Sequence, residues 1–286
     1  MGPQRTPLDG RRWHWVHGPI ELVIGADGDE PAIDAAHERA WQRYSTILQE
    51  LVTELPQLKR PVAAVDPCPL QGTVARRMWH ACAAMPADFI TSMAAVAGSV
   101  AEELIGCYRA DGIRRAWINN GGDIALHLAE GESVRVGLVA DIARHRTALD
   151  GRFAVQHTDP VRGIATSGWR GRSHSLGIAD CVTVLAATAS RADAAATVIA
   201  NAVNVDDARI RRAPASSLKD DSDLGDRLIT VDVPALPAAQ VERALARGLF
   251  VARELHALGL VHDAALVCQG RCLTLADDSA HLPLAA

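Results

Sequence analysis

The chain has 286 residues, of which 49% are hydrophobic, 22% charged and only 4% aromatic. This composition is typical of a folded globular protein and excludes collagen, coiled coils and intrinsically disordered chains. Its 29 basic and 34 acidic residues leave a net charge of −5, the wrong sign for a protein that neutralises nucleic-acid phosphates over a broad face. We therefore expect no nucleic-acid partner.

The apolar segments of the chain are short. Residues 1–15 contain no apolar run of the length that a signal peptide requires, so we expect a cytoplasmic protein. The longest apolar stretches, such as residues 93–100, fall far short of the roughly 20 residues that span a bilayer, and we expect no membrane partner. The six cysteines are scattered without the paired spacing of a zinc ribbon or redox motif, which predicts reduced thiols.

The first third of the chain is predicted to be helical. Pro31 suits the first turn of a helix, and the apolar periodicity that follows predicts an amphipathic helix ending at Pro56. A short helix is expected over residues 74–82. Thr91 or Ser92 can cap a third helix that continues until the glycine at position 112.

After residue 112 the pattern changes to short runs rich in β-branched residues, which predict a mainly antiparallel sheet packed with helices. The expected strands are residues 116–119, 124–128, 134–139, 153–157, 180–185 and 228–233, with a hairpin over 264–275. Helices are expected over 190–203 and 237–258, and a polar loop over 206–227. No linker divides the chain, which indicates a single α+β domain over 31–276, an N-terminal strand or extension over 1–30 and a loose tail over 277–286.

Three segments carry residues that could bind a ligand or take part in catalysis. The first is Asn119-Asn120-Gly121-Gly122-Asp123. Asn-Gly is the strongest short hairpin signal because both residues tolerate positive φ, so one interpretation is a plain turn. The other interpretation is that the amides of Gly121 and Gly122, which lack a Cβ, leave room for a diphosphate. Asp123 would then be available to a metal or to a donor on a ring. Both interpretations remain open.

The second segment extends from residue 164 to residue 177 and contains Thr166, Ser167, Gly168 and His174. Small and hydroxylated residues are typical of a loop, and this loop could donate several hydrogen bonds to a ligand. A histidine in such a place is more often a surface residue than a base. The spacing of Ser and His cannot establish a catalytic triad, because such groups meet in space rather than in sequence.

The third segment is the start of the helix after residue 185, where Asp193 and Thr197 are four residues apart. They therefore project from one helical face, one turn from each other. Two oxygen ligands of this kind suit a hard cation such as Mg²⁺, with waters and a substrate phosphate completing its shell. The competing interpretation is ordinary capping, since an aspartate near a helix start interacts favourably with the helix dipole.

Taken together, these segments resemble the ApbE superfamily, whose best-known members are FAD:protein FMN transferases, and more closely a UPF branch beside those enzymes. The resemblance covers residues 38–204. It is carried by Arg76-Arg77-Met78, the small-residue helix from Met93 to Gly98, Asn120-Gly121-Gly122-Asp123, Thr166-Ser167-Gly168, Ser173-His174-Ser175-Leu176-Gly177-Ile178-Ala179-Asp180, and Asp193 to Thr197 with Asn201.

The resemblance implies an ApbE-like α+β fold and a flavin dinucleotide site. FAD would be held by Asn120, Gly121, Gly122, Asp123, Thr166, Ser167 and Gly168, and Mg²⁺ by Asp193 and Thr197. A hydroxyl of a protein acceptor would attack the FMN-side phosphorus of FAD and AMP would depart. His174 is the candidate general base, since a neutral imidazole can accept a hydroxyl proton near pH 7.

Two departures from the transferases keep alternative functions open. Those enzymes have a Lys-Gly pair where this chain has Ala97-Gly98, and their His-containing segment differs from residues 173–180. The leading hypothesis is a flavin-handling protein that transfers FMN from FAD or cleaves FAD. The alternatives are a non-catalytic flavin- or pterin-binding protein, and a homo-oligomer without a dinucleotide ligand whose small residues 93–99 pack against another chain.

Overall fold

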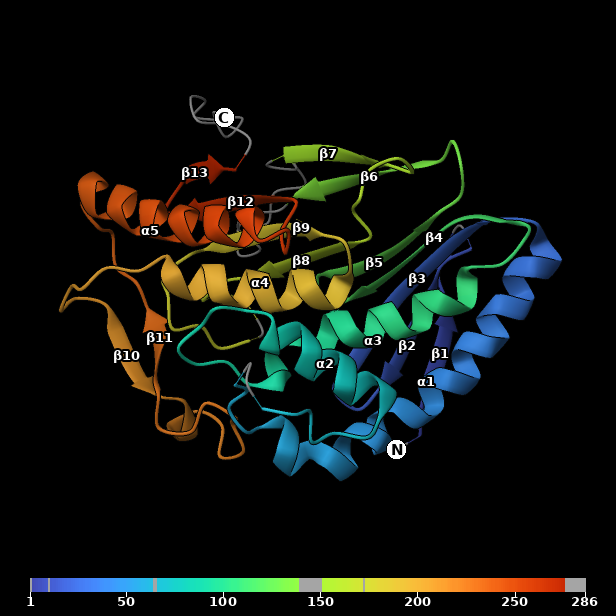
Figure 1. The fold of residues 1–286 in the computed structure, drawn as a ribbon, viewed down its shortest axis with the longest axis horizontal. Coiled ribbons are helices and arrows are strands. Elements are labelled where there is room, and N and C mark those ends of the chain that lie inside the picture. Colours follow the sequence, from blue (N-terminus) through green and yellow to red (C-terminus); the bar gives the residue numbers. More distant parts are fainter. Residues whose placement is uncertain (1, 10, 64–65, 139–150, 172, 276–286) are drawn as a thin grey trace.

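A computed structural model describes residues 2–9, 11–63, 66–138, 151–171 and 173–275. Its centre is a nine-stranded sheet in the order β1-β2-β3-β4-β5-β8-β9-β12-β13, in which every neighbouring pair is antiparallel. The five α-helices of the described part lie together over one face of the sheet, and the β6–β7 hairpin lies at its opposite side (Figure 1). The α+β fold with a mainly antiparallel sheet is thus confirmed.

The strands of the main sheet are β1 (Gln4–Pro7), β2 (Trp13–His17), β3 (Ile20–Gly28), β4 (Ile113–Asn120), β5 (Asp123–Leu128), β8 (Gly163–Ser167), β9 (Cys181–Ala186), β12 (Asp263–Cys268) and β13 (Arg271–Thr274). Two small sheets are formed by β6 (Ser133–Leu138) with β7 (Gly151–Gln156), and by β10 (Arg211–Pro214) with β11 (Leu228–Asp232). The helices are α1 (Glu30–Leu58), α2 (Thr73–Ala83), α3 (Val96–Ile105), α4 (Ala189–Ala202) and α5 (Ala238–Ala257).

The structure differs from the sequence prediction in four places. Helix α1 passes Pro56 and ends at Leu58, whose complete burial offsets the lost backbone hydrogen bond. Strand β8 was expected to be loop, yet it lies between β5 and β9. The expected loop over 206–227 contains β10 and a short 3₁₀ turn at 215–217. The third helix, expected to continue to residue 112, is interrupted and shorter, since residues 92–95 form a 3₁₀ turn, α3 begins only at Val96 and ends at Ile105, and residues 106–108 form a second 3₁₀ turn.

The N-terminal segment of the chain contributes strands to the main sheet. Residues 1–30, expected to be a strand or extension, supply β1, β2 and β3, and β3 pairs with β4 inside the main sheet. The tail expected over 277–286 lies outside the described residues. Across the described ranges, no helix combines the length and the apolar character that crossing a membrane requires.

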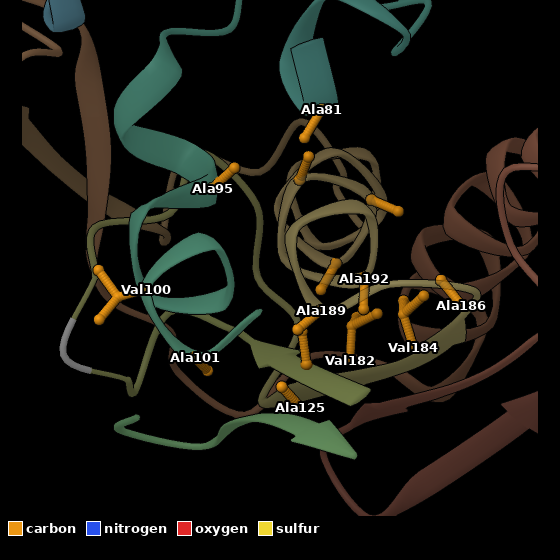
Figure 2. Close-up of a cluster of buried hydrophobic side chains, with 14 of the residues drawn as sticks. Ala81, Ala95, Val100, Ala101, Ala125, Val182, Val184, Ala186, Ala189 and Ala192 are labelled. Atoms are coloured by element: carbon orange, nitrogen blue, oxygen red, sulfur yellow. The ribbon is translucent and has the colours of Figure 1, made fainter. Parts of the chain in front are cut away.

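Helix α4 packs unusually close to its neighbours because the facing residues are small. Figure 2 shows Ala189 and Ala192 of α4 beside Val182 and Val184 of β9. A Cβ added at Gly163 of β8 would lie 2.1 Å from the carbonyl carbon at position 188, so only glycine permits this approach. The close fit fixes the position of α4 over β8 and β9, and with it the position of any functional group on α4.

Candidate functional site

Asp123 and Asp193 bring two carboxyl groups together at the junction of the sheet and the helices. Asp123 begins β5 and is buried, with 7% of its surface exposed, while Asp193 lies in the first half of α4 and keeps partial exposure. The two side chains are hydrogen-bonded to each other. Two carboxylates cannot both accept in one hydrogen bond, so one of them must hold a proton.

Burial sets the protonation of this acid pair, Asp123 with Asp193. Loss of solvent raises the pKa of Asp123 to about 7, although the amide of Thr166 and the hydrogen bond from Asp193 oppose the rise. Burial also raises the pKa of Asp193 well above its usual range, and the nearby charge of Asp123 adds to that rise. Asp193 therefore holds the shared proton and donates it to Asp123. At neutral pH the pair therefore carries at most one negative charge in place of two.

Backbone amides from three elements converge on the acid pair. The amide of Gly98 donates to Oδ2 of Asp193 at 2.9 Å, and the amide of Ala97 donates to the same side chain. The amide of Thr166 donates to Oδ1 of Asp123 at 3.1 Å. Asp193 thus caps the N-terminus of α3 from a neighbouring helix, and the interruption before Val96 creates the free amides that it accepts.

The β4–β5 hairpin ends in the two-residue turn Gly121-Gly122, as the Asn-Gly pattern predicts. Both glycines have positive φ, 66° and 116°, which a type I′ turn requires. The side chain of Asn119 accepts from the amide of Gly122 at 2.8 Å, and Asn120 donates through Nδ2 to the carbonyl of Ala97 at 3.0 Å. The amide group of Asn120 therefore ties the hairpin to α3.

Thr166, Ser167 and Gly168 follow one another at the end of β8. Thr166 is brought to the acid pair by its amide, while its Oγ1 lies 3.4 Å from Oγ1 of Thr183. A Cβ at Gly168 would lie 2.5 Å from the carbonyl oxygen of Asp180, so a side chain there would push the following loop away. The structure thus brings Thr166 to the hairpin and makes Gly168 a packing position.

Thr197 and Asn201 extend the face of α4 that carries Asp193. Thr197 is half-buried one turn after Asp193. One turn further, Oδ1 of Asn201 accepts from the hydroxyl of Ser175 at 3.2 Å and from the amide of Leu176 at 2.9 Å. This helix face therefore extends from the acid pair to the loop that carries the predicted base, and Thr197 lies between them.

His174 is half-buried in the loop between β8 and β9, and the loop itself is held in place. The amide at position 230 donates to the carbonyl of Ser175 at 2.9 Å, and Arg212 donates to the carbonyl of Leu176. Within the described ranges, His174 makes no hydrogen bond or ion pair with Asp123, Asp193 or Thr197. The structure anchors the backbone beside His174 without bringing its ring into contact with the acid pair.

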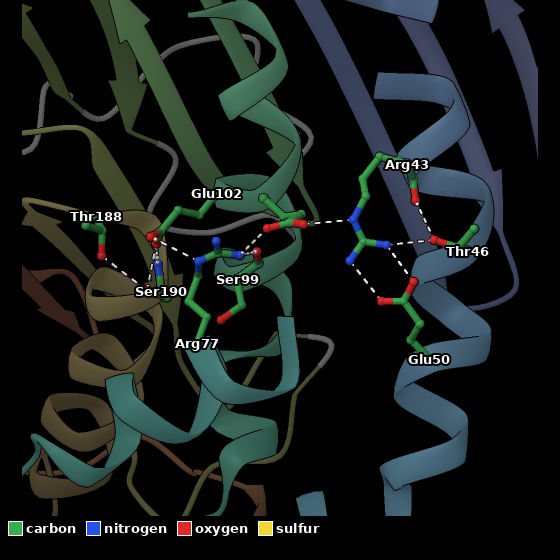
Figure 3. Close-up of polar contacts among 9 residues, drawn as sticks. Arg43, Thr46, Glu50, Arg77, Ser99, Glu102, Thr188 and Ser190 are labelled. Atoms are coloured by element: carbon green, nitrogen blue, oxygen red, sulfur yellow. Dashed lines mark hydrogen bonds and ion pairs between the residues drawn. The ribbon is translucent and has the colours of Figure 1, made fainter. Parts of the chain in front are cut away.

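A chain of charged side chains fixes the start of α4, as Figure 3 shows. Glu102 of α3 accepts from the amide of Ser190 at 3.0 Å and from its hydroxyl at 2.7 Å, and so caps the first turn of α4. Arg77 of α2 pairs with Glu102 at 3.3 Å and with Glu103 at 2.8 Å. Arg43 of α1 pairs with Glu103 at 2.7 Å. These contacts connect all four helices beside the acid pair.

Sequence reasoning missed the polar residues that the segment 215–227 brings toward this site. Thr91, expected to be a helix cap, makes no capping bond and instead donates to Oδ2 of Asp223 at 2.5 Å. Burial, then Asp193 and Asp223, raise the pKa of the Cys82 thiol. Asp223 lies in the segment expected to be a polar loop over 206–227, and only the tertiary contact with buried Thr91 reveals its position.

The donor set at the acid pair fits a hard divalent cation. Asp123, Asp193 and Thr197 offer carboxylate and hydroxyl oxygens, the ligand type that Mg²⁺ prefers. A cation could replace the shared proton, because its charge would offset the repulsion that now keeps one carboxyl protonated. Across the described part of the chain, no group of three or more His, Cys, Asp or Glu side chains is placed to hold a metal. A cation here would depend on non-carboxylate oxygens as well.

Comparison with known proteins identifies the class to which this α+β fold belongs. The family described as "AbpE bacteria" matches residues 4–274. A UPF0280 protein of Methanopyrus kandleri is 35% identical over 199 residues, which cover 68% of this chain and 75% of that protein. A UPF0280 protein of Methanosarcina acetivorans is 30% identical over 187 residues, covering 65% and 70%. The chain therefore belongs to the ApbE-like superfamily, in its UPF0280 branch.

Other relatives match over shorter stretches or at lower identity. A UPF0280 protein of Methanothermobacter thermautotrophicus is 43% identical over 115 residues, which span 39% of this chain and 42% of that protein. Among solved structures, the flavin transferase ApbE of Vibrio cholerae has a TM-score of 0.47 and 12% identity, covering 96% of this chain and 97% of that one.

Proposed function

We propose that this protein binds FAD together with Mg²⁺ at the acid pair and transfers the FMN part of FAD to a hydroxyl acceptor. The observation that carries the proposal is the buried, proton-sharing pair of Asp123 and Asp193, which the amides of Ala97 and Gly98 hold at the start of α3. Membership of the ApbE-like superfamily supports flavin as the ligand class. The glycine turn at 121–122 adds backbone that a diphosphate could approach.

Each residue then has a distinct role. Asp123, Asp193 and Thr197 would hold Mg²⁺, which supplies charge neutralisation at the diphosphate when it is bound. Thr166 and Ser167, at the end of β8, and the amide of Gly121 would position the dinucleotide, since the amide of Gly122 already donates to Asn119. The hydroxyl oxygen of the acceptor forms a bond to the FMN-side phosphorus, the bond to the bridging oxygen breaks, and AMP leaves. His174 would accept the hydroxyl proton.

A second function, flavin binding without catalysis, is favoured by the position of His174. Its ring makes no contact with the acid pair, and the position before Gly98 is occupied by Ala97 in place of a lysine. A chain with the cation site but without an aligned base would hold FAD without cleaving it.

One titration distinguishes the two candidate functions. FAD fluorescence is measured with wild-type protein in the presence and absence of Mg²⁺, and the mixture is assayed for AMP and FMN by mass spectrometry. Asp193→Asn keeps the shape of the side chain but cannot release a proton to become a charged ligand, and we expect it to abolish the dependence of binding on Mg²⁺. Glu130→Gln, at an exposed carboxyl, is the matched control.

The outcomes decide between the candidates. Mg²⁺-dependent binding with AMP release, both lost in Asp193→Asn, supports the transferase. Binding without AMP release, even with candidate acceptor proteins, supports the non-catalytic function. If wild-type protein and Asp193→Asn respond identically to FAD and Mg²⁺, the assignment of the acid pair is wrong.

A further inference from the structure

A cleft lies at the opposite end of the β4–β5 hairpin from the acid pair. It has a volume of about 560 Å³, which is within the range of small-molecule sites. Its walls are the loop from Arg109 to Gly112, the start of β4 and the end of β5, and Asp29 before α1. Because β4 begins at this cleft and reaches the glycine turn at its other end, the cleft is separate from the proposed flavin site.

Two basic side chains, Arg109 and His127, line this cleft, and Arg162 lies near them. The pKa of His127 is lowered by burial first, and then by the nearby cations Arg109 and Arg162 and by His157, with only the carbonyl of Ile113 opposing the effect. Burial also lowers the pKa of Arg162, with Arg109 adding to the effect and Asp159 opposing it. The positive charges of Arg109 and Arg162 therefore repel each other beside the cleft.

The hydrogen bonds of these groups leave donor capacity unused. Nε2 of His127 lies 3.2 Å from the carbonyl of Ile113, so Nε2 carries the proton, and the free Nδ1 can donate to a ligand only after it takes up a second proton. The guanidinium of Arg162 donates to three backbone carbonyls. The side chain of Arg109 is exposed and makes no hydrogen bond or ion pair among the described residues. Its five donors remain available to a ligand.

Acidic side chains that line the cleft restrict the charge of the ligand that it can bind. Asp29 and Asp111 also line it, and Arg114 is already paired with Glu132 at 3.6 Å. A polyanion would meet these two carboxylates, whereas a molecule with one anionic group could place that group beside Arg109.

We propose that this cleft binds the phosphate or carboxylate group of a small molecule, with Arg109 as its direct contact and His127 as a second contact once its ring is protonated at Nδ1. An anion there relieves the repulsion among the basic groups and gains charge-assisted hydrogen bonds from the guanidinium. The volume exceeds what a lone oxyanion needs, so the ligand is a metabolite that carries such a group. This site is independent of flavin binding at the acid pair.

The test is a titration followed at His127. Protein labelled at histidine is titrated with inorganic phosphate, methyl phosphate and acetate, and the His127 ring signals, assigned with His127→Gln, are followed by NMR. We expect a saturable shift, with methyl phosphate and acetate distinguishing a phosphate ligand from a carboxylate ligand. Arg109→Ala should weaken the binding about tenfold or more, while Arg243→Ala, at an exposed arginine of α5, leaves it unchanged.

Two results would overturn the proposal. One is the absence of any saturable shift at His127 with all three probes. The other is equal binding by Arg109→Ala and Arg243→Ala, which would show that any anion response is non-specific. Circular dichroism of each variant confirms that the fold is retained, and because Arg109 is exposed, its replacement leaves the packing intact.

Discussion

The two ends of the β4–β5 hairpin differ in how their charges are satisfied. At the turn end, Asp123 and Asp193 are enclosed, and backbone amides of Ala97, Gly98 and Thr166 donate to them. At the other end, Arg109 is exposed and has no partner within the described ranges. The carboxyl groups of the acid pair thus find their hydrogen-bond partners within the fold, whereas the guanidinium of Arg109 depends on solvent or a ligand for its partners.

The largest expected effect is on the pH dependence of stability at the acidic end. A carboxyl whose pKa is raised in the folded state stabilises the fold fully below its ordinary pKa, and this contribution is lost as the pH rises through the folded value. For Asp123, the rise from 3.8 to about 7 corresponds to about 4 kcal/mol. We expect wild-type protein to lose stability relative to Asp123→Asn, which has no carboxyl to ionise at that position, between pH 4 and pH 8, measured by urea unfolding without divalent cations. Parallel curves for the two proteins would contradict a shared buried proton.

The next effect concerns the contact that brings α3 to α4. A Cβ at Gly98 would lie 2.3 Å from the carbonyl oxygen of Ala189, whereas a Cβ at Gly106 would meet nothing within 4 Å. We expect Gly98→Ala to lower the free energy of unfolding by about 2–3 kcal/mol, because the two helices must separate. Gly106→Ala, the matched control, should change it by less than about 0.5 kcal/mol. Chemical denaturation of both variants provides the measurement, and equal stabilities would mean that the helices are not in close contact.

A smaller effect is expected at the cap of α4. Glu102→Gln can still accept from the amide of Ser190, but it loses the charge that interacts with the helix N-terminus and with Arg77. We expect a loss of about 1–2 kcal/mol in the free energy of unfolding. Glu130→Gln, which changes an exposed carboxyl, serves as the control in the same thermal or urea unfolding series. A loss equally large in the control would assign the effect to net charge.

The smallest effect on stability is expected at the basic end. Arg109→Ala removes a cation that has no partner among the described residues, so we expect a change within about 0.5 kcal/mol. The same replacement should raise the pKa of His127, because burial and the cation at Arg109 both lower it. NMR titration of the His127 ring measures this directly. An unchanged pKa would place the guanidinium of Arg109 away from the cleft.

The sequence predicted those parts of the fold and the site that local patterns determine. The Asn-Gly pattern correctly predicted the turn at Gly121-Gly122, and the spacing of Asp193 and Thr197 placed both on one face of α4. The interruption of the helix before Val96 could not be predicted, since the apolar periodicity continues through it. Its cause is tertiary, because Asp193 accepts the amides that the interruption exposes.

Long-range contacts account for the other differences. The meeting of Asp123 with Asp193 depends on the order of strands in the sheet, which no spacing in the sequence encodes. Strand β8 consists of small and hydroxylated residues typical of a loop, and only its two neighbouring strands make it a strand. Asp223 was assigned to solvent because its neighbours are polar, while its actual partner, Thr91, lies far away in the chain.

The strands at the two ends of the main sheet have a consequence for self-association. Both β1 and β13 are only four residues long, β1 is exposed along its whole length, and Pro7 cannot donate a hydrogen bond to a further strand. Charged Arg5 and Arg271 lie on these strands. The exposed edge strand of a sheet can pair with a strand of another chain and so lead to aggregation. Short, charged edge strands offer few backbone groups for such pairing. We therefore expect concentrated solutions of this protein to resist fibril formation.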